Sequence, residues 1–453
     1  MLENPFFHRG PIRDPEYFYN RERETKLALQ MLAKKQSVSV IGPRKIGKTS
    51  LLFHISRPEV MRQHGIDPTQ HLFVYINCEE LGHLSREALY TLLVGEISDQ
   101  ARRQGHHIAL PDRPDSHLEF ERAMGEVFRQ GLRLALLFDE FEILSENQSL
   151  GSAFFSGLRA LPNRFDMAYL TASRRPLLSL PHTEEYSPFF NIFVPLKLGL
   201  FSETASRQLI ENSLTKAGVT LSPSIVDGVL TLGGGHPFFL QVAAFWALEL
   251  QETKGSPLQI QDMRLLNQSV RGQIESHFDY YWNHLRETEC YVLAALPLTQ
   301  EEGRYREEIE ALASLCLIVP ENGRYRYFSP LFGDFVRRQQ IKGLLQAGPF
   351  LLDLANRRAL QRGEPLSLSV SQYELMVYLM EHRDRVIGNE ELDREVLGAS
   401  EKSQGRYEYL GDERLKSAIK GLRKALGKDA ICIENKRGIG YVFRVRPSEH
   451  EDV

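Results

Sequence analysis

The sequence predicts an α/β domain with a parallel sheet, followed by a helical lid and two winged-helix domains. The first 200 residues contain five short apolar segments separated by helical patterns or loops. From about Ser202 onward apolar residues recur at helical spacing, and two later blocks each combine helices with a closing hairpin. Strands that alternate with helices typically form a parallel sheet covered on both faces, so an α/β domain is expected to precede the helical ones.

The length and composition of the chain indicate several folded domains. Its 453 residues exceed the size at which a single hydrophobic core stops growing, so we expect two to four domains. With 42% hydrophobic and 25% charged residues, the composition excludes a largely disordered chain. The formal net charge of −4 provides no global field that would draw the whole protein onto nucleic acid or anionic lipid. Any basic surface must therefore be local.

Cysteine spacing and hydropathy indicate a cytoplasmic protein that does not enter a membrane. The cysteines Cys78, Cys290, Cys316 and Cys432 lack the paired spacing of zinc sites and of disulfide frameworks. The amino-terminal residues do not combine a basic start with an apolar run, as a signal peptide does. No apolar stretch approaches the roughly 18 residues that a membrane span requires.

Five segments are the expected strands of the sheet. Each is short and apolar, as buried strands are. They span residues 37–42, 71–78, 132–139, 167–173 and 191–198. The segment TSLLFHI, which follows the first strand and a glycine-containing loop, is typical of a helix. We assign residues 1–200 to this core domain.

The middle of the chain is predicted to be helical. Helical spacing of apolar residues assigns residues 201–285 to a helical lid. Residues 286–345 are expected to form a first winged helix, because helices over 291–296 and 307–315 precede two short strands within 316–328. An Asn-Gly turn joins these two strands.

The last block of the chain is predicted to be a separate domain. Glycine and proline within residues 346–364 rarely sit inside one continuous element, so we expect a linker there. Residues 365–453 form the second winged helix. Its expected elements are a strand at 367–370, helices at 372–382, 389–398 and 413–426, a polar loop before the last helix, and a hairpin at 431–445.

A phosphate-binding loop follows the first strand. Gly42, Gly47, Lys48 and Thr49 satisfy the pattern G-x-x-x-x-G-K-[ST] at a strand-to-helix junction. In such a loop backbone N–H groups surround phosphates, the lysine neutralises the terminal phosphates, and the threonine hydroxyl binds Mg²⁺. A glycine turn with a surface lysine is the alternative, and the flanking strand and helix argue against it. The core is thus predicted to be a P-loop NTPase that binds ATP and Mg²⁺ through Gly42, Pro43, Arg44, Lys45, Ile46, Gly47, Lys48, Thr49 and Ser50.

Two adjacent carboxylates end the third predicted strand. Asp139 is expected to hold Mg²⁺ together with Thr49, and Glu140 to orient or deprotonate the attacking water. Alone, this pattern is equally typical of a strand that ends in a solvated acidic turn. The upstream phosphate loop favours the catalytic interpretation, so Glu140 and Lys48 are predicted catalytic residues.

Three further residues are candidates for nucleotide contacts. Arg174 follows the fourth strand, where a cation can sense the terminal phosphate or stabilise transition-state charge, and a solvated surface arginine is the alternative. His236 and Pro237 begin a predicted helix after three glycines. For His236 a capping or packed histidine is the plainer interpretation.

The order of these motifs resembles the STAND class of P-loop ATPases, which is related to archaeal ATPases and origin-recognition AAA+ proteins. The resemblance covers about residues 15–340. It implies that Arg174 senses nucleotide, that Pro237 packs near adenine, and that residues 19–22 flank the base. That segment usually contains Gly-Arg-Glu, and this chain has Asn20 in place of the glycine. The resemblance also implies a switch whose nucleotide state sets lid position and homo-oligomerisation.

The predicted helix at 413–426 combines an apolar stripe with a basic one. Its apolar residues fall on one face: Leu415, Ala418, Ile419, Leu422 and Leu426. From Arg414 to Arg446 we count ten basic residues against two acidic ones, Asp429 and Glu434. A solvated helix face is the plain interpretation, and DNA binding is the functional one. The candidate DNA contacts are Arg414, Lys416, Lys420, Arg423, Lys424, Lys436 and Arg437.

Residues 365–446 resemble the winged-helix output domain of OmpR/PhoB-type response regulators. The segments QYELMVYLMEH, LRKALG and KRGIGYVF carry this resemblance. It implies that helix 413–426 enters the major groove of double-stranded DNA and that the hairpin near Lys436 and Arg437 lies on the minor groove. Gly421 departs from the family, which often has a larger polar residue there. Glycine weakens a helix by up to about 1 kcal/mol relative to alanine.

These observations together predict an ATP-gated DNA-binding regulator with slow, regulatory ATP hydrolysis. A protein partner or signal would act at the lid and first winged helix. Two alternatives remain open at the level of sequence. One is a signalling or defence scaffold whose winged helices bind protein, and the other is a DNA-remodelling or initiator-like AAA+ ATPase. The second would require an arginine in trans, and no residue can be named for that role.

Overall fold

The computed structural model describes residues 4–6, 10–180, 188–299, 303–398 and 413–445. It divides into two compact units. The first comprises Met1–Gln273 with Ser314–Leu317, and the second comprises Ile274–Ala313 with Ile318–Val453. No helix in the described ranges has both the length and the apolar character needed to cross a membrane.

The first unit contains a five-stranded parallel sheet with the order β2-β3-β4-β1-β5. All neighbours in this sheet are parallel. Each strand lies within a segment predicted from the sequence: β1 (Ser37–Ile41), β2 (His71–Asn77), β3 (Arg133–Asp139), β4 (Met167–Ser173) and β5 (Phe193–Lys197). Since β4 lies between β1 and β3, the carboxyl ends of these three strands meet at one edge. The phosphate loop, Asp139 and Arg174 follow these ends.

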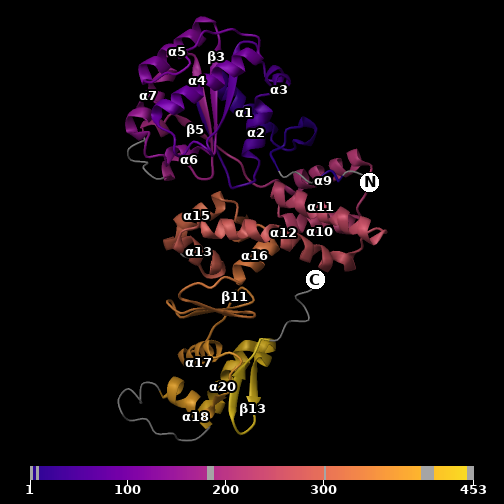
Figure 1. The fold of residues 1–453 in the computed structure, drawn as a ribbon. Helices are drawn as coiled ribbons and strands as arrows, with labels where there is room; N and C mark the ends of the chain where they lie inside the picture. Colours follow the sequence, from indigo (N-terminus) through magenta and orange to yellow (C-terminus); the bar gives the residue numbers. More distant parts are fainter. Residues whose placement is uncertain (1–3, 7–9, 181–187, 300–302, 399–412, 446–453) are drawn as a thin grey trace. The chain divides into compact units, whose positions relative to one another are not determined.

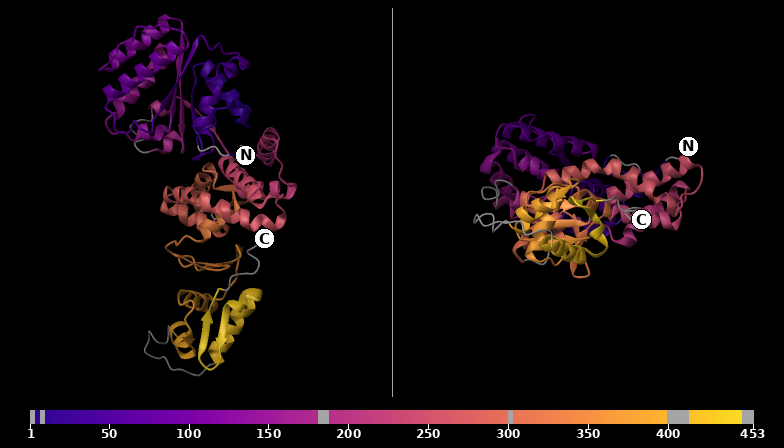
Figure 2. Two further views of the ribbon diagram at one scale, coloured as in Figure 1. Left: turned by 45° about the vertical axis from the view of Figure 1, so that its right-hand side comes forward. Right: turned by 90° about the horizontal axis from the view of Figure 1, so that it is seen from below.

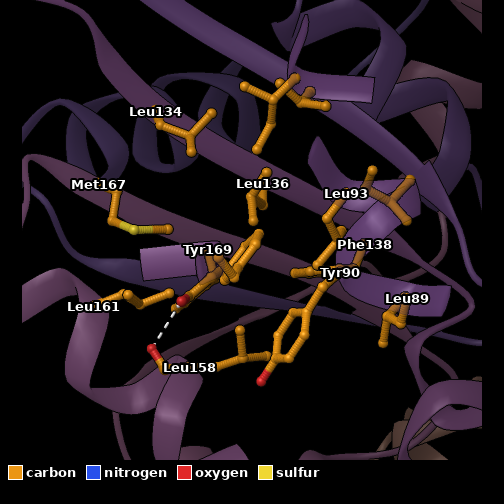
Figure 3. Packing of buried hydrophobic residues seen from close by; sticks show 14 of the residues in the cluster. Leu89, Tyr90, Leu93, Leu134, Leu136, Phe138, Leu158, Leu161, Met167 and Tyr169 are labelled. Carbon is orange, nitrogen blue, oxygen red and sulfur yellow. Dashed lines mark hydrogen bonds between the residues drawn. The ribbon is translucent and has the colours of Figure 1, made fainter. Parts of the chain in front are cut away.

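Helices cover both faces of the sheet (Figures 1 and 2). On one face lie α4 (Arg86–Arg103), α5 (His117–Arg129) and α7 (Gly151–Arg164), and on the other α1 (Glu22–Ala33), α2 (Lys48–Ile55) and α3 (Pro58–Gln63). Figure 3 shows Leu136, Phe138 and Tyr169 of adjacent strands in one buried cluster with Tyr90 of α4. The Tyr169 hydroxyl is buried there and donates to the Leu158 carbonyl oxygen at 2.7 Å. The predicted P-loop NTPase fold is confirmed.

The predicted helical lid begins with three helices of the first unit. These are α9 (Glu203–Ala217), α10 (Pro223–Gly233) and α11 (Pro237–Lys254), and α12 (Met263–Asn283) follows. Ser202 caps α9, because its side chain accepts a hydrogen bond from the backbone N–H of Ala205. Proline begins α10 and α11, where its missing N–H is of no consequence. The limits of the predicted lid and of the two winged helices stay predictions.

The second unit begins with helices that precede a hairpin. Its elements are α13 (Glu287–Ala294), α14 (Leu296–Thr299), α15 (Arg306–Ser314), β6 (Ile318–Glu321), β7 (Arg324–Tyr327) and α16 (Pro330–Arg337). Asn322 and Gly323 join β6 to β7 with φ angles of 50° and 79°. A type I′ hairpin turn has two positive φ angles of this kind, so the predicted Asn-Gly turn is present.

Residues 346–364, predicted to be a linker, instead carry most of a four-stranded antiparallel sheet. Its strands are β8 (Leu344–Ala347), β9 (Phe350–Asp353), β10 (Arg358–Gln361) and β11 (Glu364–Pro365). The residues that suggested a boundary lie in tight turns, where Gly348 and Gly363 have φ angles of 57° and 82°. Because Phe350, Leu352 and Ala359 are buried, the segment is a packed element.

The remaining elements form the carboxy-terminal winged helix. They are α17 (Val370–Glu381), β12 (Ile387–Gly388), α18 (Asn389–Leu392), a five-residue π-helix (Asp393–Leu397), α20 (Glu413–Leu426), β13 (Ile433–Lys436) and β14 (Gly440–Phe443). Helix α20 has the predicted bounds. The strand predicted at 367–370 is wrong, because Ser369 caps α17 in a reciprocal pair of hydrogen bonds with Gln372. The predicted polar loop falls within 399–412, outside the described residues.

Candidate nucleotide and DNA sites

Two glycines shape the phosphate loop for different reasons. A Cβ atom on Gly42 would lie 2.8 Å from the Leu198 carbonyl oxygen, so only glycine fits beside the end of β5. Gly47 has a φ angle of 104°, a conformation that side chains disfavour, and it precedes the first residue of α2. The loop therefore turns tightly from β1 into the amino terminus of α2, as phosphate binding requires.

Lys48 is buried within the loop that it follows. Its Nζ atom donates to the carbonyl oxygens of Gly42 and Pro43 at 3.0 and 3.2 Å. Burial lowers the pKa of Lys48, and nearby carboxylates, Glu140 first, oppose this shift. An amine held against two carbonyl oxygens is ready to exchange them for the stronger acceptors of a phosphate.

The two predicted magnesium ligands are in direct contact. The Thr49 hydroxyl donates to Oδ2 of Asp139 at 2.6 Å. The Tyr75 hydroxyl donates to the same oxygen at 3.0 Å, and the backbone N–H of Glu140 donates to Oδ1 at 3.2 Å. Asp139 is buried, so these donors hold its carboxylate in one orientation at the end of β3.

Glu140 lies beside the same carboxylate in an unusual backbone conformation. Its φ angle of 50° is left-handed, and it forms the amino-terminal cap position of α6 (Phe141–Ser145). Burial raises the pKa of Glu140, and attraction by Lys48 only partly opposes this. A carboxylate that is harder to ionise is a better proton acceptor once ionised, which suits the predicted role towards water.

Arg174 is engaged by a carboxylate that the sequence analysis did not single out. Oε1 of Glu142 accepts hydrogen bonds from Nε of Arg174 at 2.5 Å and from its backbone N–H at 3.3 Å. The two side chains form an ion pair at the carboxyl end of β4. The sequence signal was available, since Glu142 follows Asp139 by three positions.

The segment expected to flank the base contacts the loop through Arg21. This buried arginine donates from Nη2 to the carbonyl oxygens of Ile46 at 3.3 Å and Gly199 at 2.8 Å, and its guanidinium lies 4.8 Å from the Phe201 ring. Arg21 therefore joins the phosphate loop to the segment that leads into α9. Asn20, which replaces the usual glycine, has a φ angle of 53° and so adopts the conformation glycine favours.

The predicted lid residues begin α11 close to the phosphate loop. His236 is buried at the cap position of α11, with its ring 4.5 Å from that of Phe239, and Pro237 opens the helix. The next residue, Phe238, has its ring 5.5 Å from Nζ of Lys45 in the loop. This contact brings the start of α11 beside the loop.

The residues around Lys48 fit a nucleotide bound with Mg²⁺. Hydroxyl and carboxylate oxygens, which Thr49 and Asp139 supply, are the ligands that Mg²⁺ prefers, usually with phosphate oxygens completing its coordination. Within the part of the chain that the structure describes, no group of three or more His, Cys, Asp or Glu side chains could hold a metal ion. The cations Lys48 and Arg174 face three carboxylates, so a divalent ion would also restore charge balance for an anionic ligand.

Helix α20 separates its apolar and basic residues as predicted. Leu415, Ile419, Leu422 and Leu426 are buried in the core of the winged helix, and Ala418 is half-buried. Lys420, Lys424 and, in the turn between β13 and β14, Arg437 are exposed. Gly421 packs closely against α17, because a Cβ atom there would lie 2.9 Å from Nε2 of Gln372.

The side chains of the other predicted DNA contacts form hydrogen bonds or ion pairs within the domain. Arg414 donates from Nε and Nη2 to the buried carboxylate of Asp393, and Nη2 of Arg423 donates to the Ile433 carbonyl oxygen at 2.6 Å. Lys416 and Lys436 pair with the neighbouring Glu413 and Glu434. The exposed lysines are thus better placed for a phosphate backbone than the two arginines. Arg446 lies outside the described residues.

Two family models match the chain. The family described as novel STAND NTPase 2 matches residues 28–300, and the one described as transcriptional regulatory protein, C terminal, matches residues 363–443. The first match contains the phosphate loop, Asp139 and Arg174. The second contains α17, α20 and the terminal hairpin.

Solved structures share the fold of the larger part of the chain. The Walker-type ATPase of Pyrococcus abyssi is 18% identical, with a TM-score of 0.53 over 73% of this chain and 99% of that one. The ORC2 protein of Aeropyrum pernix is 14% identical, with a TM-score of 0.50 over 74% of this chain and 96% of that one. At these identities the likeness concerns the fold alone.

Curated relatives match a smaller part of the chain. The response regulator ArlR of Staphylococcus saprophyticus is 30% identical over 109 residues, which cover 24% of this chain and 47% of ArlR. The two-component response regulator PhoP of Pseudomonas aeruginosa is 24% identical over 147 residues, covering 32% and 63%. The chain spans about half the length of the curated relatives it matches.

Proposed function

The chain belongs to the novel STAND NTPase 2 family, and on this premise we propose that it is an ATP-dependent switch controlling its own DNA-binding domain. It joins an NTPase domain to an OmpR/PhoB-type winged helix, which supports a role in transcription regulation. The observation that carries the ATP-binding half is the contact between Thr49 and Asp139 at 2.6 Å, beside the buried Lys48. A magnesium-binding pair and a phosphate-binding lysine meet there at one sheet edge.

Each residue of the site has a distinct task in this proposal. The loop N–H groups and Lys48 bind the phosphates, while Thr49 and Asp139 hold the metal. A bound Mg²⁺ supplies positive charge to the phosphate oxygens. Glu140 orients water and accepts its proton, and Arg174 recognises the terminal phosphate. Hydrolysis is slow and resets the switch.

Nucleotide state would reach the rest of the chain through contacts around the loop. Lys45 lies against Phe238 of α11, and Arg21 bonds both Ile46 of the loop and Gly199 ahead of α9. A phosphate that displaces the loop backbone acts on both contacts, so α9 and α11 are the elements whose position changes. Homo-oligomerisation on ATP binding, and a signal acting at the lid or first winged helix, complete the proposal.

In the DNA-binding half, α20 enters the major groove and the β13–β14 turn contacts the adjacent backbone. The exposed Lys420 and Lys424 and the exposed Arg437 support this proposal. Contacts by Arg414, Lys416, Arg423 and Lys436 require their present partners to be exchanged for DNA. The apolar stripe of α20 is buried, which leaves only the basic face for a ligand.

The gating proposal is tested by measuring affinity for duplex DNA with and without ATP and Mg²⁺ at stated ionic strength. We expect ATP to change the affinity of the wild type by at least about fivefold, a typical coupling between two sites. Lys48→Ala should abolish the response, because the phosphates lose their central cation. Lys34→Ala, an exposed lysine after α1, is the matched control and should respond like the wild type.

The same experiment separates the alternatives. Equal DNA affinity in all nucleotide states would discard gating. A double variant, Lys420→Glu with Lys424→Glu, should lose DNA binding, and a protein-binding scaffold would show no DNA binding to lose. A turnover rate that DNA stimulates many-fold would favour a remodelling ATPase over a slow switch.

A further inference from the structure

We propose that Glu142 is the positioning residue for Arg174 and that discrimination between ATP and ADP depends on it. The inference rests on the proposed ATP-binding function and goes beyond it, because it assigns a task to a residue that belongs to none of the expected motifs. Glu142 lies on α6 and Arg174 follows β4, so two elements distant in sequence meet in this pair.

One carboxylate oxygen of Glu142 fixes both the backbone and the side chain of Arg174. Oε1 accepts from the Arg174 backbone N–H at 3.3 Å and from Nε at 2.5 Å. The first bond holds the chain where it leaves the sheet, and the second sets the direction of the guanidinium. A charge-assisted bond of this kind is about twice as strong as a neutral one.

The pair is asymmetric in its exposure. The Glu142 side chain is 3% exposed and the Arg174 side chain 26%, so the carboxylate is embedded in the domain while the arginine reaches towards solvent. The hydrogen bond at Nε from the buried side restricts the orientation of the planar guanidinium. Its orientation is then decided before any ligand arrives, and less conformational freedom is lost on binding.

A buried carboxylate at this place needs an explanation. Glu142 is close enough to Lys48 to oppose the lowering of the lysine pKa, together with Glu140 and Asp139. A third negative charge beside Lys48 repels an anionic ligand, and a glutamine would accept the same hydrogen bond without that penalty. The charge is therefore explained if it secures the arginine that meets the terminal phosphate.

The second carboxylate oxygen points to the same function. Oε2 of Glu142 is buried and accepts no hydrogen bond from any residue that the structure describes. Buried carboxylate oxygens are normally satisfied, so an orphan of this kind marks a place where a water molecule or a donor is expected with the ligand. This oxygen can therefore accept a hydrogen bond from one further donor.

The test compares affinity for a non-hydrolysable ATP analogue with affinity for ADP, both with Mg²⁺, by titration calorimetry. Glu142→Ala should weaken binding of the analogue about tenfold, roughly the difference a charge-assisted bond makes, and leave ADP affinity within about twofold. The isosteric Glu142→Gln should give a smaller loss of the same kind and guards against a folding defect. Glu146→Ala, an exposed glutamate that ends the same helix, is the matched control.

A double-variant cycle completes the experiment. In an Arg174→Ala background, Glu142→Ala should change neither affinity further, because the residue acts only through the arginine. Tighter binding of the analogue by Glu142→Gln, or equal weakening of both nucleotides, would overturn the positioning role while leaving ATP binding intact. A wild type that binds neither nucleotide would overturn the proposed function itself.

Discussion

Asp139 shows how single residues set the chemistry of the site. Its Oδ2 atom accepts hydrogen bonds from the hydroxyls of Thr49 and Tyr75, so two donors hold the oxygen that is expected to face the metal. Thr49 follows from the phosphate-loop pattern. Tyr75 does not, because it meets Asp139 only through the pairing of β2 with β3.

Removal of the Tyr75 hydroxyl should weaken the metal site. In Tyr75→Phe the Asp139 carboxylate loses one of its two hydroxyl donors, so we expect the Mg²⁺ concentration for half-maximal ATPase activity to rise about three- to tenfold. Tyr169→Phe is the matched control, since it removes a buried hydroxyl from the same sheet, bonded to Leu158 away from the site. It should lower stability without moving the Mg²⁺ dependence. Equal Mg²⁺ curves for Tyr75→Phe and the wild type would exclude the role of Tyr75.

Glu140 should make activity and stability respond to pH in opposite directions. Burial raises its pKa, so the base is lost, and turnover falls, as pH decreases through that raised value. A carboxyl with a raised folded pKa stabilises the fold below its unfolded pKa, and this contribution is lost as pH rises through the folded pKa. Glu140→Gln should therefore abolish turnover and raise the melting temperature at pH 7.5.

The stabilisation by Glu140→Gln should shrink as the pH is lowered towards the ordinary glutamate pKa of about 4.3. Differential scanning calorimetry at several pH values measures it, with Glu146→Gln as an exposed control. A gain that is constant with pH would show that the stabilisation does not come from removing the charge of Glu140.

At the level of elements, the sequence predicted the strands and helices whose apolar residues follow a clear local pattern. All five strands of the parallel sheet lie within the expected segments, and α20 has the expected bounds, because an apolar run or stripe records burial directly. The strand order and the Glu142–Arg174 pair depend on contacts between distant segments, which no local pattern records. The linker predicted at 346–364 is a sheet for a related reason, since glycine and proline occur in hairpin turns as well as in linkers.

The sheet β8–β11 fills the place predicted for the linker and contacts elements on both of its sides in the chain. Leu351 and Leu360 pack with Ala295 and Leu298 of the first winged helix. On the carboxy-terminal side, Arg362 in the turn between β10 and β11 pairs with Asp429, just after α20. The neighbouring Gln361 donates to the Leu426 carbonyl oxygen at 2.8 Å. The end of α20 is thereby bonded to the segment that was expected to be a linker.

The exposed lysines of α20 should set the salt dependence of DNA binding. Each phosphate contact contributes about 0.9 to the slope of log affinity against log salt, so Lys420→Ala with Lys424→Ala should reduce that slope by about 1.8. Gel shifts or anisotropy between about 50 and 200 mM salt measure it. Lys216→Ala, in α9 of the first unit, is the control and should leave the slope unchanged. An unchanged slope in the double variant would show that α20 does not contact the phosphate backbone.

For the whole molecule, the two compact units allow coupling to be measured by calorimetry. ATP with Mg²⁺ at a hundred times its dissociation constant should stabilise the first unit by about 2.7 kcal/mol. If the sites are coupled, linkage requires ATP also to shift the transition of the second unit when DNA is present, and DNA to shift that of the first. Lys48→Ala should remove the ATP effects. Two transitions that each respond only to their own ligand would mean independent sites.

The sheet β8–β11 also limits which DNA arrangements the protein can read. A DNA-binding domain on a flexible linker can bind paired DNA motifs at variable separations, because the linker adjusts its length to each separation. Here Leu351 and Leu360 are buried against the preceding helices, so the DNA-binding domain has little freedom to move relative to the first winged helix. An assembly that joined copies of the chain through the first winged helix would then accept paired motifs at one separation and helical phase, and would reject a pair moved by half a turn of the duplex.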